Sequence, residues 1–332
     1  MKKIIVLGGT GFVGAHVCEK LVRDGWAVTV PTRRRIKATN IMHLPNLTVL
    51  ELDVNDEAAL TRAVAGHEAL VNLVAILHGT QEAFERTHVA LPRKIAKACL
   101  AGGVAQVVHV SALGADALQP EKLPSMYLRS KSEGEAVLMQ AASGAGASGQ
   151  AGFDLSILRP SVIFGAEDKF INVFANLQRM LPVMPLAGAT ARFQPVWVED
   201  VAQAVVACLA GASKTASPRI IEAVGPEVFT LKQLVQLSAQ LAGIGGGFGR
   251  PVFALPDWVA RIQAKLMSLA PGEPVMSDDN LDSMKLDNVS SGQLPGLASL
   301  GIIPSALQPI AQDYLNGCNI RSGLMGLRSR SH

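Results

Sequence analysis

The sequence predicts an α/β protein in which a doubly wound parallel β-sheet has helices on both faces and a smaller, mainly helical lobe follows at the C-terminus. Short apolar runs alternate with helical segments through the first 165 residues, the pattern of a parallel sheet. A glycine-rich turn follows the first apolar run at once. From about Gly225 the pattern changes to helices separated by Gly- and Pro-rich turns, which predicts the smaller lobe.

The chain opens with a buried-strand pattern, Ile4 to Leu7, that runs into Gly8-Gly9-Thr10-Gly11-Phe12-Val13-Gly14 and then into a helical segment ending near Asp24. Gly8 allows a tight turn, Gly11 lets the backbone approach a pyrophosphate, and Gly14 lets the helix pack close to the sheet. Because phosphates bind at helix N-termini, this segment predicts a dinucleotide site. The alternative is a glycine-rich turn without a ligand.

Strands are expected near residues 3–7, 27–31, 47–51, 69–74, 106–111 and 155–160. The tract 141–149 has linker composition, and we expect a flexible surface insertion there. We expect a strand end and a helix over Val196 to Leu209, and a further strand over Arg219 to Val224. Residues 1–225 are thus assigned to a nucleotide-binding domain, with part of a substrate lobe inserted at about 165–195, and residues 226–332 to the small lobe.

The end of the second strand predicts the type of dinucleotide, because the adenosine ribose lies against it. An acidic residue there accepts hydrogen bonds from a 2′-hydroxyl, whereas arginine binds a 2′-phosphate. Here the strand leads into Pro31-Thr32-Arg33-Arg34-Arg35, with no acid in reach. Guanidinium groups bind phosphate through paired donors, so Arg33 and Arg34 predict NADP(H). The alternative is a solvated basic turn.

Asp53 and Val54 follow the third strand and are expected beside the adenine. The alternative is that Asp53 or Asn55 caps the helix that follows.

Tyr127-Leu128-Arg129-Ser130-Lys131 begins a predicted helix that runs towards Met139. Residues four apart share a helix face, so the phenol and the ammonium can reach one ligand. A nearby lysine stabilises a phenolate and lowers the tyrosine pKa from its usual value of about 10. Because this pair follows a fifth strand that ends in Val110-Ser111, we predict that Tyr127 donates a proton and that Lys131 also binds the nicotinamide ribose. The alternative is a surface pair without a function.

Composition excludes several classes of function. The net charge is +3, and scattered Lys and Arg do not form a nucleic-acid groove. Four cysteines without paired spacing (Cys18, Cys99, Cys208 and Cys318) argue against a zinc site or disulfides and fit a reducing cytosol. Seven histidines without ligand spacing predict no metal site, so His78 and His88 are not assigned to catalysis. We expect Asp200 to start or orient a helix and Thr230 to be an N-cap.

The chain contains a surplus of apolar residues, 49% against 17% charged ones. Its glycines come too early for a secretory signal, and no run of 18 apolar residues occurs, so only peripheral membrane contact is expected. A helix is predicted over Asp257 to Ala270, with Trp258, Val259, Ile262, Leu266 and Leu269 along one stripe and Arg261, Lys265 and Ser268 opposite. This stripe predicts docking on a bilayer or membrane protein. The alternative is packing into the core of the small lobe.

Together these residues resemble the extended or atypical short-chain dehydrogenase/reductases of the NAD-dependent epimerase/dehydratase superfamily, whose glycine spacing is Gly-x-x-Gly-x-x-Gly. Within it, the chain is most similar to the NADPH-binding accessory subunits of respiratory complex I and their bacterial relatives. The segments that carry this resemblance are Asp154 to Gly165, Glu167 to Asn172, Gln194 to Val201 and Trp258 to Arg261.

The resemblance implies a Rossmann domain and a set of cofactor contacts. These are Gly8, Thr10, Gly11, Phe12, Arg33, Asp53, Ala75, Lys131, Arg159 and Pro160. The motifs described above add Val13, Gly14, Arg34 and Val54 to the expected cofactor-binding residues. This chain departs from the family pattern at one position. Active extended reductases have a second hydroxyl residue just after the fifth strand, whereas here Ser111 is followed by Ala112 and Leu113. Either Ser111 takes that role or the hydroxyl is absent.

Two classes of function remain open. The first is an NADP(H)-dependent oxidoreductase that acts on an apolar carbonyl or quinone-like compound, with Tyr127, Lys131 and Ser111 as catalytic residues. The second is a protein that holds NADPH as a structural ligand within a respiratory or quinone-biosynthetic assembly. A sugar-nucleotide epimerase or dehydratase is a weaker third reading, since fold does not settle chemistry. The expected location is the cytoplasm, with peripheral contact at the inner face of the membrane.

Overall fold

A computed structural model describes residues 1–144, 152–211, 217–256, 258–262 and 276–315 of the protein. Most of the tract 141–149, and the predicted helix beyond residue 262, lie outside the described residues. The chain divides into two compact units. The first comprises Met1–Pro160, Glu199–Ala223 and Ser290–Ile303, and the second comprises Ser161–Val198, Val224–Val289 and the described part of Pro304–His332.

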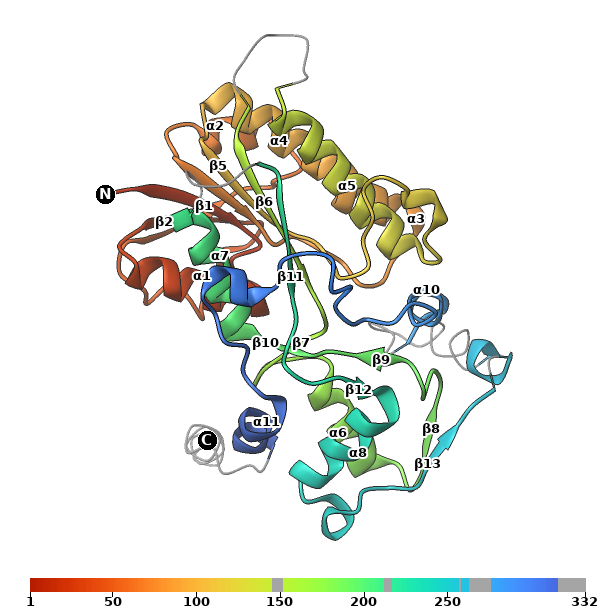
Figure 1. Cartoon of the computed structure of the whole chain (residues 1–332). Coiled ribbons are helices and arrows are strands. Elements are labelled where there is room, and N and C mark those ends of the chain that lie inside the picture. The colour runs from red at the N-terminus through yellow and green to blue at the C-terminus, as the bar shows by residue number, and fades with distance from the viewer. Residues whose placement is uncertain (145–151, 212–216, 257, 263–275, 316–332) are drawn as a thin grey trace. The chain divides into compact units, whose positions relative to one another are not determined.

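The first unit is built on a seven-stranded sheet in the order β11-β6-β5-β4-β1-β2-β3 (Figure 1). Every neighbouring pair in this sheet is parallel. The strands are β1 (Lys3–Leu7), β2 (Ala27–Thr32), β3 (Leu47–Glu51), β4 (Ala69–Asn72), β5 (Gln106–Val110), β6 (Asp154–Pro160) and β11 (Arg219–Ala223). The predicted strands are therefore confirmed, and β1 lies at the switch point between β2 and β4, where such sheets bind ligands beyond the carboxyl ends of their strands.

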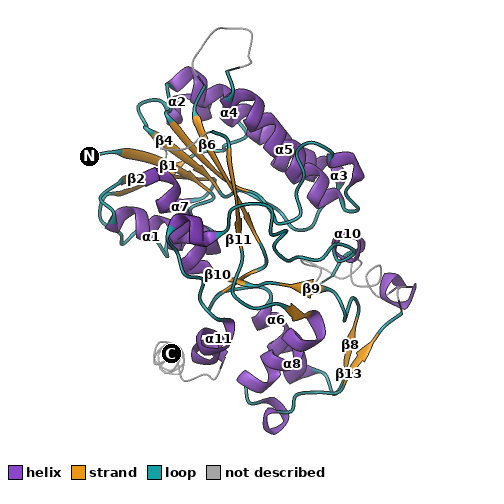
Figure 2. Ribbon diagram, viewed as in Figure 1, coloured by secondary structure: helices purple, strands orange, loops and turns teal. Residues whose placement is uncertain are grey.

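Helices of the first unit cover both faces of this sheet, with α2, α4 and α5 on one face and α1 and α7 on the other (Figure 2). Their bounds are α1 (Phe12–Arg23), η1 (Arg35–Ala38), α2 (Glu57–Val64), α3 (Gln81–Phe84), η2 (Glu85–Ala90), α4 (Leu91–Gly102), η3 (Pro120–Lys122), α5 (Met126–Ala142), α7 (Val198–Gly211) and η5 (Leu297–Leu300). Of these, η2 is a π-helix. Asp200 lies in the first turn of α7, as expected.

Apolar side chains from the sheet and from the helices on one of its faces form a core of the first unit. Ile5, Leu70 and Ile157 come from the strands and pack with Leu60 of α2 and Ile95 of α4, all fully buried. Burying one such side chain contributes about 1.5–3 kcal/mol, so this packing holds α2 and α4 against the sheet.

The second unit is mainly helical, with short strands in pairs. Its helices are α6 (Ile171–Met180), α8 (Leu231–Leu241), η4 (Ile244–Gly247), α10 (Asp278–Ser283) and α11 (Leu307–Leu315), and residues 258–262 are also helical. The strand pairs are β7 (Ile163–Phe164) with β10 (Val196–Trp197), β8 (Met184–Leu186) with β13 (Val252–Ala254), and β9 (Arg192–Phe193) with β12 (Phe229–Thr230). Its core packs Phe164 and Ile171 against α8 and α11.

Two polar residues organise local structure in the second unit. Thr230 caps α8 in a capping box with Gln233, which confirms the predicted N-cap. Asp168 accepts hydrogen bonds from the N–H groups of Gly165 and Phe170 and from the hydroxyl of Tyr314, at 3.1, 2.8 and 3.1 Å. The Glu167 to Asn172 segment that carries part of the family resemblance therefore holds the start of α6 and anchors α11.

Candidate functional site

The glycine turn has the geometry that its sequence predicts. Gly8 has φ of +83°, and the N–H of Gly11 donates to the Gly8 carbonyl at 3.0 Å. A Cβ on Gly14 would lie 2.2 Å from that carbonyl oxygen, so only glycine allows α1 to pack this close to the turn. Gly11 is the N-cap of α1 and provides no side-chain cap, and the first turn contains no acidic residue. The N–H groups of this first turn, which includes Phe12 and Val13, suit an anion.

The segment after β4 lies beside the glycine turn. A Cβ on Gly8 would lie 3.1 Å from the carbonyl carbon of Leu73. Two residues further on, Ala75 is exposed, whereas Thr10 of the turn is half-buried. The structure therefore places the start of the segment that contains Ala75 next to the turn.

Arg33 and Arg34 follow β2 and are exposed, as a phosphate ligand requires. Hydrogen bonds from Asn55 lower the pKa of Asp53 below its usual value, and the charge of Arg33 adds to this effect. Asp53 thus lies near Arg33, while Val54 packs against the core of the first unit. The alternative for Asp53, that it or Asn55 caps the next helix, is wrong. The N-cap of α2 is Asp56, which accepts from the Ala59 N–H at 3.0 Å. Asp53 instead accepts from the N–H and the amide of Asn55, which closes a tight turn.

Ser111, Tyr127 and Lys131 come together at the carboxyl end of β5. Lys131 is buried, and its Nζ donates to the carbonyl oxygen of Val110 at 2.7 Å. Tyr127 packs against a small apolar cluster that includes Ala112. Ser111 is 5% exposed, and its Oγ has no hydrogen-bond partner among the described residues. A buried hydroxyl without a partner is costly, so this position is suited to a ligand that completes it.

Burial sets the protonation of this pair differently from the sequence expectation. Burial raises the pKa of Tyr127 to about 12 instead of lowering it. Burial also lowers the pKa of Lys131 to about 8, against an opposing effect of the Glu135 carboxylate. The ammonium of Lys131 is directed to a backbone carbonyl, which explains why it does not offset the desolvation of the phenol.

His88, which the sequence left without a catalytic role, lies within the site. Its Nδ1 lies 2.9 Å from Ser130 Oγ, and its Nε2 accepts from the N–H of Ile76 at 3.1 Å. Its ring packs edge-on to the ring of Tyr127 at 5.6 Å between centroids. Burial, and then the charge of Lys131, lower the pKa of His88 to about 3. His88 is therefore a neutral imidazole. It connects Ile76, in the segment that follows β4, to Ser130 of α5.

His88 lies in the π-helix η2, which packs against α5. A Cβ on Gly134 of α5 would lie 2.0 Å from the His88 carbonyl oxygen, so the two helices touch backbone to backbone there. No sequence periodicity marks a π-helix, and this is why the sequence did not give His88 its structural role. His109 is a site residue that sequence reasoning missed. It is buried on β5, its Nδ1 lies 3.0 Å from the Asn72 amide, and burial lowers its pKa well below the usual value.

Arg159 and Pro160, at the end of β6, are engaged within the first unit. Arg159 donates two hydrogen bonds to Glu135, at 3.0 and 2.6 Å, and Glu135 is fully buried. The carbonyl oxygen of Pro160 accepts from the Leu113 N–H at 2.9 Å. Their predicted contacts with a cofactor therefore compete with interactions that these residues already make.

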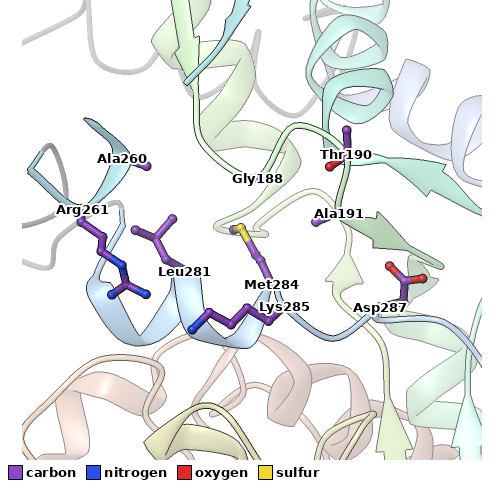
Figure 3. A pocket seen from close by; sticks show the side chains of 9 residues that line it. All are labelled: Gly188, Thr190, Ala191, Ala260, Arg261, Leu281, Met284, Lys285 and Asp287. Carbon is purple, nitrogen blue, oxygen red and sulfur yellow. The ribbon is translucent and has the colours of Figure 1, made fainter. Parts of the chain in front are cut away.

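A separate cavity of about 290 Å³ lies in the second unit (Figure 3). Met284 points towards Gly188, and Leu281 lies between Met284 and Ala260 (Figure 3). Two cations line the same cavity, and both are paired with Asp282: Arg261 at 2.9 Å and Lys285 at 2.7 Å. The cavity combines an apolar surface with a charged rim, as small-molecule sites do.

Within the described residues, no group of three or more His, Cys, Asp or Glu side chains is arranged to hold a metal ion. The three described cysteines, Cys18, Cys99 and Cys208, are buried free thiols. No helix in the described ranges is both long and apolar enough to span a bilayer.

Comparison with known proteins agrees with this fold. Residues 4–223 match the NAD dependent epimerase/dehydratase family. The chain is 34% identical, over 91% of its length and 77% of the relative's, to mitochondrial NADH dehydrogenase (ubiquinone) 1 alpha subcomplex subunit 9 of Mus musculus. It is 30% identical to ceramide reductase of Caulobacter vibrioides, over 61% of this chain and 60% of that protein.

Among solved structures, the fold is similar to the Thermus thermophilus UDP-glucose 4-epimerase complex with NAD. The TM-score is 0.66 at 19% identity, and the match covers 95% of this chain and 99% of that chain. At this identity the likeness concerns the fold alone.

Proposed function

Because the chain belongs to the NAD dependent epimerase/dehydratase family, we propose that it binds NADP(H) and reduces an apolar carbonyl or quinone-like substrate. The observation that carries this proposal is the convergence of Ser111, Tyr127 and Lys131 on the carboxyl end of β5. The relative named ceramide reductase supports a reductase that takes an apolar substrate.

The residues present fit a nicotinamide dinucleotide. The uncapped first turn of α1 suits the pyrophosphate, and the unpartnered hydroxyl of Ser111 suits a carbonyl oxygen. The bound dinucleotide would supply a hydride. Tyr127 would donate the proton to the carbonyl oxygen, and Lys131 would turn its ammonium from the Val110 carbonyl towards the ribose.

The preference for the 2′-phosphate would come from Arg33 and Arg34. Both are exposed after β2, and the neighbouring carboxylate, Asp53, accepts hydrogen bonds from Asn55. NADPH should bind at least tenfold more tightly than NADH, a difference of about 1.4 kcal/mol. Fluorescence titration with both nucleotides tests this. Replacing Arg33 and Arg34 by alanine should remove the preference, and Arg35→Ala, which changes the next arginine in η1, is the matched control.

A second function is favoured by one specific observation. Burial holds the pKa of Tyr127 at about 12 while Lys131 is bonded to the backbone, an arrangement poorly prepared for proton transfer. The protein would then hold NADPH as a structural ligand in a respiratory or quinone-biosynthetic assembly, as its likeness to a complex I subunit suggests. Tight NADPH binding without turnover of any quinone or carbonyl in cell extract would favour this second function.

A sugar-nucleotide epimerase or dehydratase is a weaker candidate, supported only by the shared fold. Our proposal also includes a location in the cytoplasm with peripheral contact at the membrane. Trp258 and Ile262, which belong to the predicted apolar stripe, are 69% and 52% exposed, in keeping with that contact.

A further inference from the structure

Two segments of the second unit lie side by side and carry almost no polar side chains. Strand β13 pairs in parallel with β8, with Val252 opposite Met184. Arg250 donates from its N–H and its Nε to Gln178 of α6, at 3.2 and 3.1 Å. Arg250 is also the only residue with a polar side chain in the segments 180–189 and 241–256.

We call the exposed apolar residues of these segments the apolar edge. They are Met180, Leu181, Val183, Phe248 and Phe253, exposed by 80, 38, 42, 92 and 57%. Scattered single exposed apolar residues are normal, but adjoining ones mark an interaction surface.

An ordered turn holds Phe248 outward. Ile244 is buried in the core of the second unit, and its carbonyl oxygen accepts from the Gly249 N–H at 3.0 Å. Gly249 has φ of +72°, and a Cβ there would lie 2.7 Å from the Ala239 Cβ. Because both ends of the turn are fixed against the core, the exposure of Phe248 is built into the fold. Burying such a side chain would contribute about 1.5–3 kcal/mol, so contact with an apolar phase is favourable.

The charges of the residues around the apolar edge indicate which kind of partner would cover it. Residues 170–198 and 228–256 contain no Asp or Glu, whereas Arg179 at the end of α6 and Arg250 lie beside the exposed apolar side chains. An apolar surface flanked by cations is the pattern that binds anionic bilayers. A protein partner would be expected to find a rim of mixed hydrogen-bonding groups, which these segments do not offer. The chain's own last residues, 316–332, contain Arg321, Arg328 and Arg330 and no acid, so their charge does not complement the edge.

We propose that the apolar edge docks on a bilayer containing anionic lipid, with Phe248 and Met180 among the acyl chains and Arg179 and Arg250 at the headgroups. The proposal rests on the membrane location included in the proposed function and specifies its surface and its lipid chemistry. It is independent of cofactor binding.

Co-sedimentation with vesicles tests it, using phosphatidylcholine alone and phosphatidylcholine mixed with phosphatidylglycerol. The intact chain should sediment with the anionic mixture. Phe248→Glu and Met180→Glu should each lower the partition coefficient at least tenfold, and Arg179→Gln should lower it about fivefold, equivalent to about 1 kcal/mol per arginine. Leu118→Glu, which changes an 85% exposed residue of the first unit, should have no effect.

Four results would overturn the proposal. The first is absence of sedimentation of the intact chain, and the second is sedimentation of Phe248→Glu equal to that of the intact chain. The third is binding only to native membranes that trypsin treatment abolishes, which would assign the edge to a membrane protein. The fourth concerns the stability of the variants. Phe248→Ser guards against misfolding: a lowered free energy of unfolding in urea for both Phe248 variants would mean that the chain itself covers the edge. NADPH titration of the same variants separates this test from the cofactor proposal, since loss of NADPH binding with intact sedimentation would affect only the latter.

Discussion

Nδ1 of His88 lies 2.9 Å from Oγ of Ser130, and this contact ties the π-helix η2 to the helix that carries Tyr127 and Lys131. Since His88 Nε2 accepts from the Ile76 N–H, the ring must be neutral with its proton on Nδ1. The Ser130 hydroxyl in turn lies 2.9 Å from the Tyr127 carbonyl oxygen, to which it donates. One imidazole thus holds the first turn of α5 against the segment that follows β4.

The free energy of unfolding should depend on pH through the protonation of His88. The pKa of His88 is about 3 in the folded protein against 6.5 for a free histidine, so the unfolded chain binds more protons between these values. The contribution of His88 to stability should be complete above pH 6.5 and should fall by up to about 1.4 kcal/mol per pH unit as the pH drops towards 3. Urea unfolding between pH 7 and pH 4.5 measures this slope.

His88→Gln, which can still accept from the Ile76 N–H, is the matched variant for that slope. The slope of its unfolding free energy with pH should decrease by the equivalent of about one proton. An unchanged slope would mean that His67 or His109, whose pKa values burial also lowers, accounts for the effect.

Tyr127 and Lys131 should separate in their effects on binding and chemistry. Tyr127→Phe should change NADPH affinity less than twofold and abolish any detectable reduction, because its hydroxyl serves proton transfer. Lys131→Ala should weaken NADPH binding about tenfold, since a charged hydrogen bond contributes about 1.5–3 kcal/mol. Full activity of Tyr127→Phe on a verified substrate would refute the assignment of Tyr127 as the acid.

Tyrosine ionisation can be followed directly because the chain contains only two tyrosines. In the folded protein, absorbance at about 295 nm should show little tyrosinate at pH 11, since the pKa of Tyr127 is about 12 and burial and Asp168 raise that of Tyr314 as well. Tyr314→Phe isolates Tyr127. Substantial tyrosinate in this variant at pH 10 would show that Lys131 does stabilise the phenolate, as the sequence alone suggested.

Gly14→Ala should abolish NADPH binding and destabilise the first unit. The new Cβ would lie 2.2 Å from the Gly8 carbonyl oxygen, and overpacking of this kind costs about 1–3 kcal/mol. Gly102→Ala, where the nearest atom is 3.4 Å away on a Val64 side chain, should be tolerated. Normal NADPH affinity in Gly14→Ala would exclude the glycine turn as the pyrophosphate site.

The ion pair between Arg159 and Glu135 should matter for stability. Arg159→Met leaves the fully buried Glu135 carboxylate without its partner and should cost about 3–5 kcal/mol in urea unfolding. The double variant with Glu135→Leu should recover most of that loss. If the double variant binds NADPH normally, the Arg159 side chain is a structural residue; a large loss of affinity would restore it as a cofactor contact.

The sequence by itself determined the architecture of the first unit and the placement of its glycine turn. Alternation of apolar strands with helices is a local signal, and each predicted strand of the sheet forms within a few residues of its expected bounds. Gly8 and Gly14 could be assigned roles because a tight turn and a close helix packing depend on short stretches of chain. Local spacing also placed Tyr127 and Lys131 on one face of α5.

Only the tertiary structure decided the electrostatics of the site and which apolar residues of the second unit are exposed. The pKa of Tyr127 depends on desolvation by segments distant in sequence, and Lys131 bonds to Val110, 21 positions away. His88 contacts Ser130, which is 42 positions away in the sequence, because it lies in a π-helix that no sequence periodicity predicts. The two segments of the apolar edge likewise come together only through the pairing of β8 with β13 and the hydrogen bonds from Arg250 to Gln178. Burial, desolvation and contact between distant segments exist only in the folded chain, and this is why these features could not be predicted from the sequence.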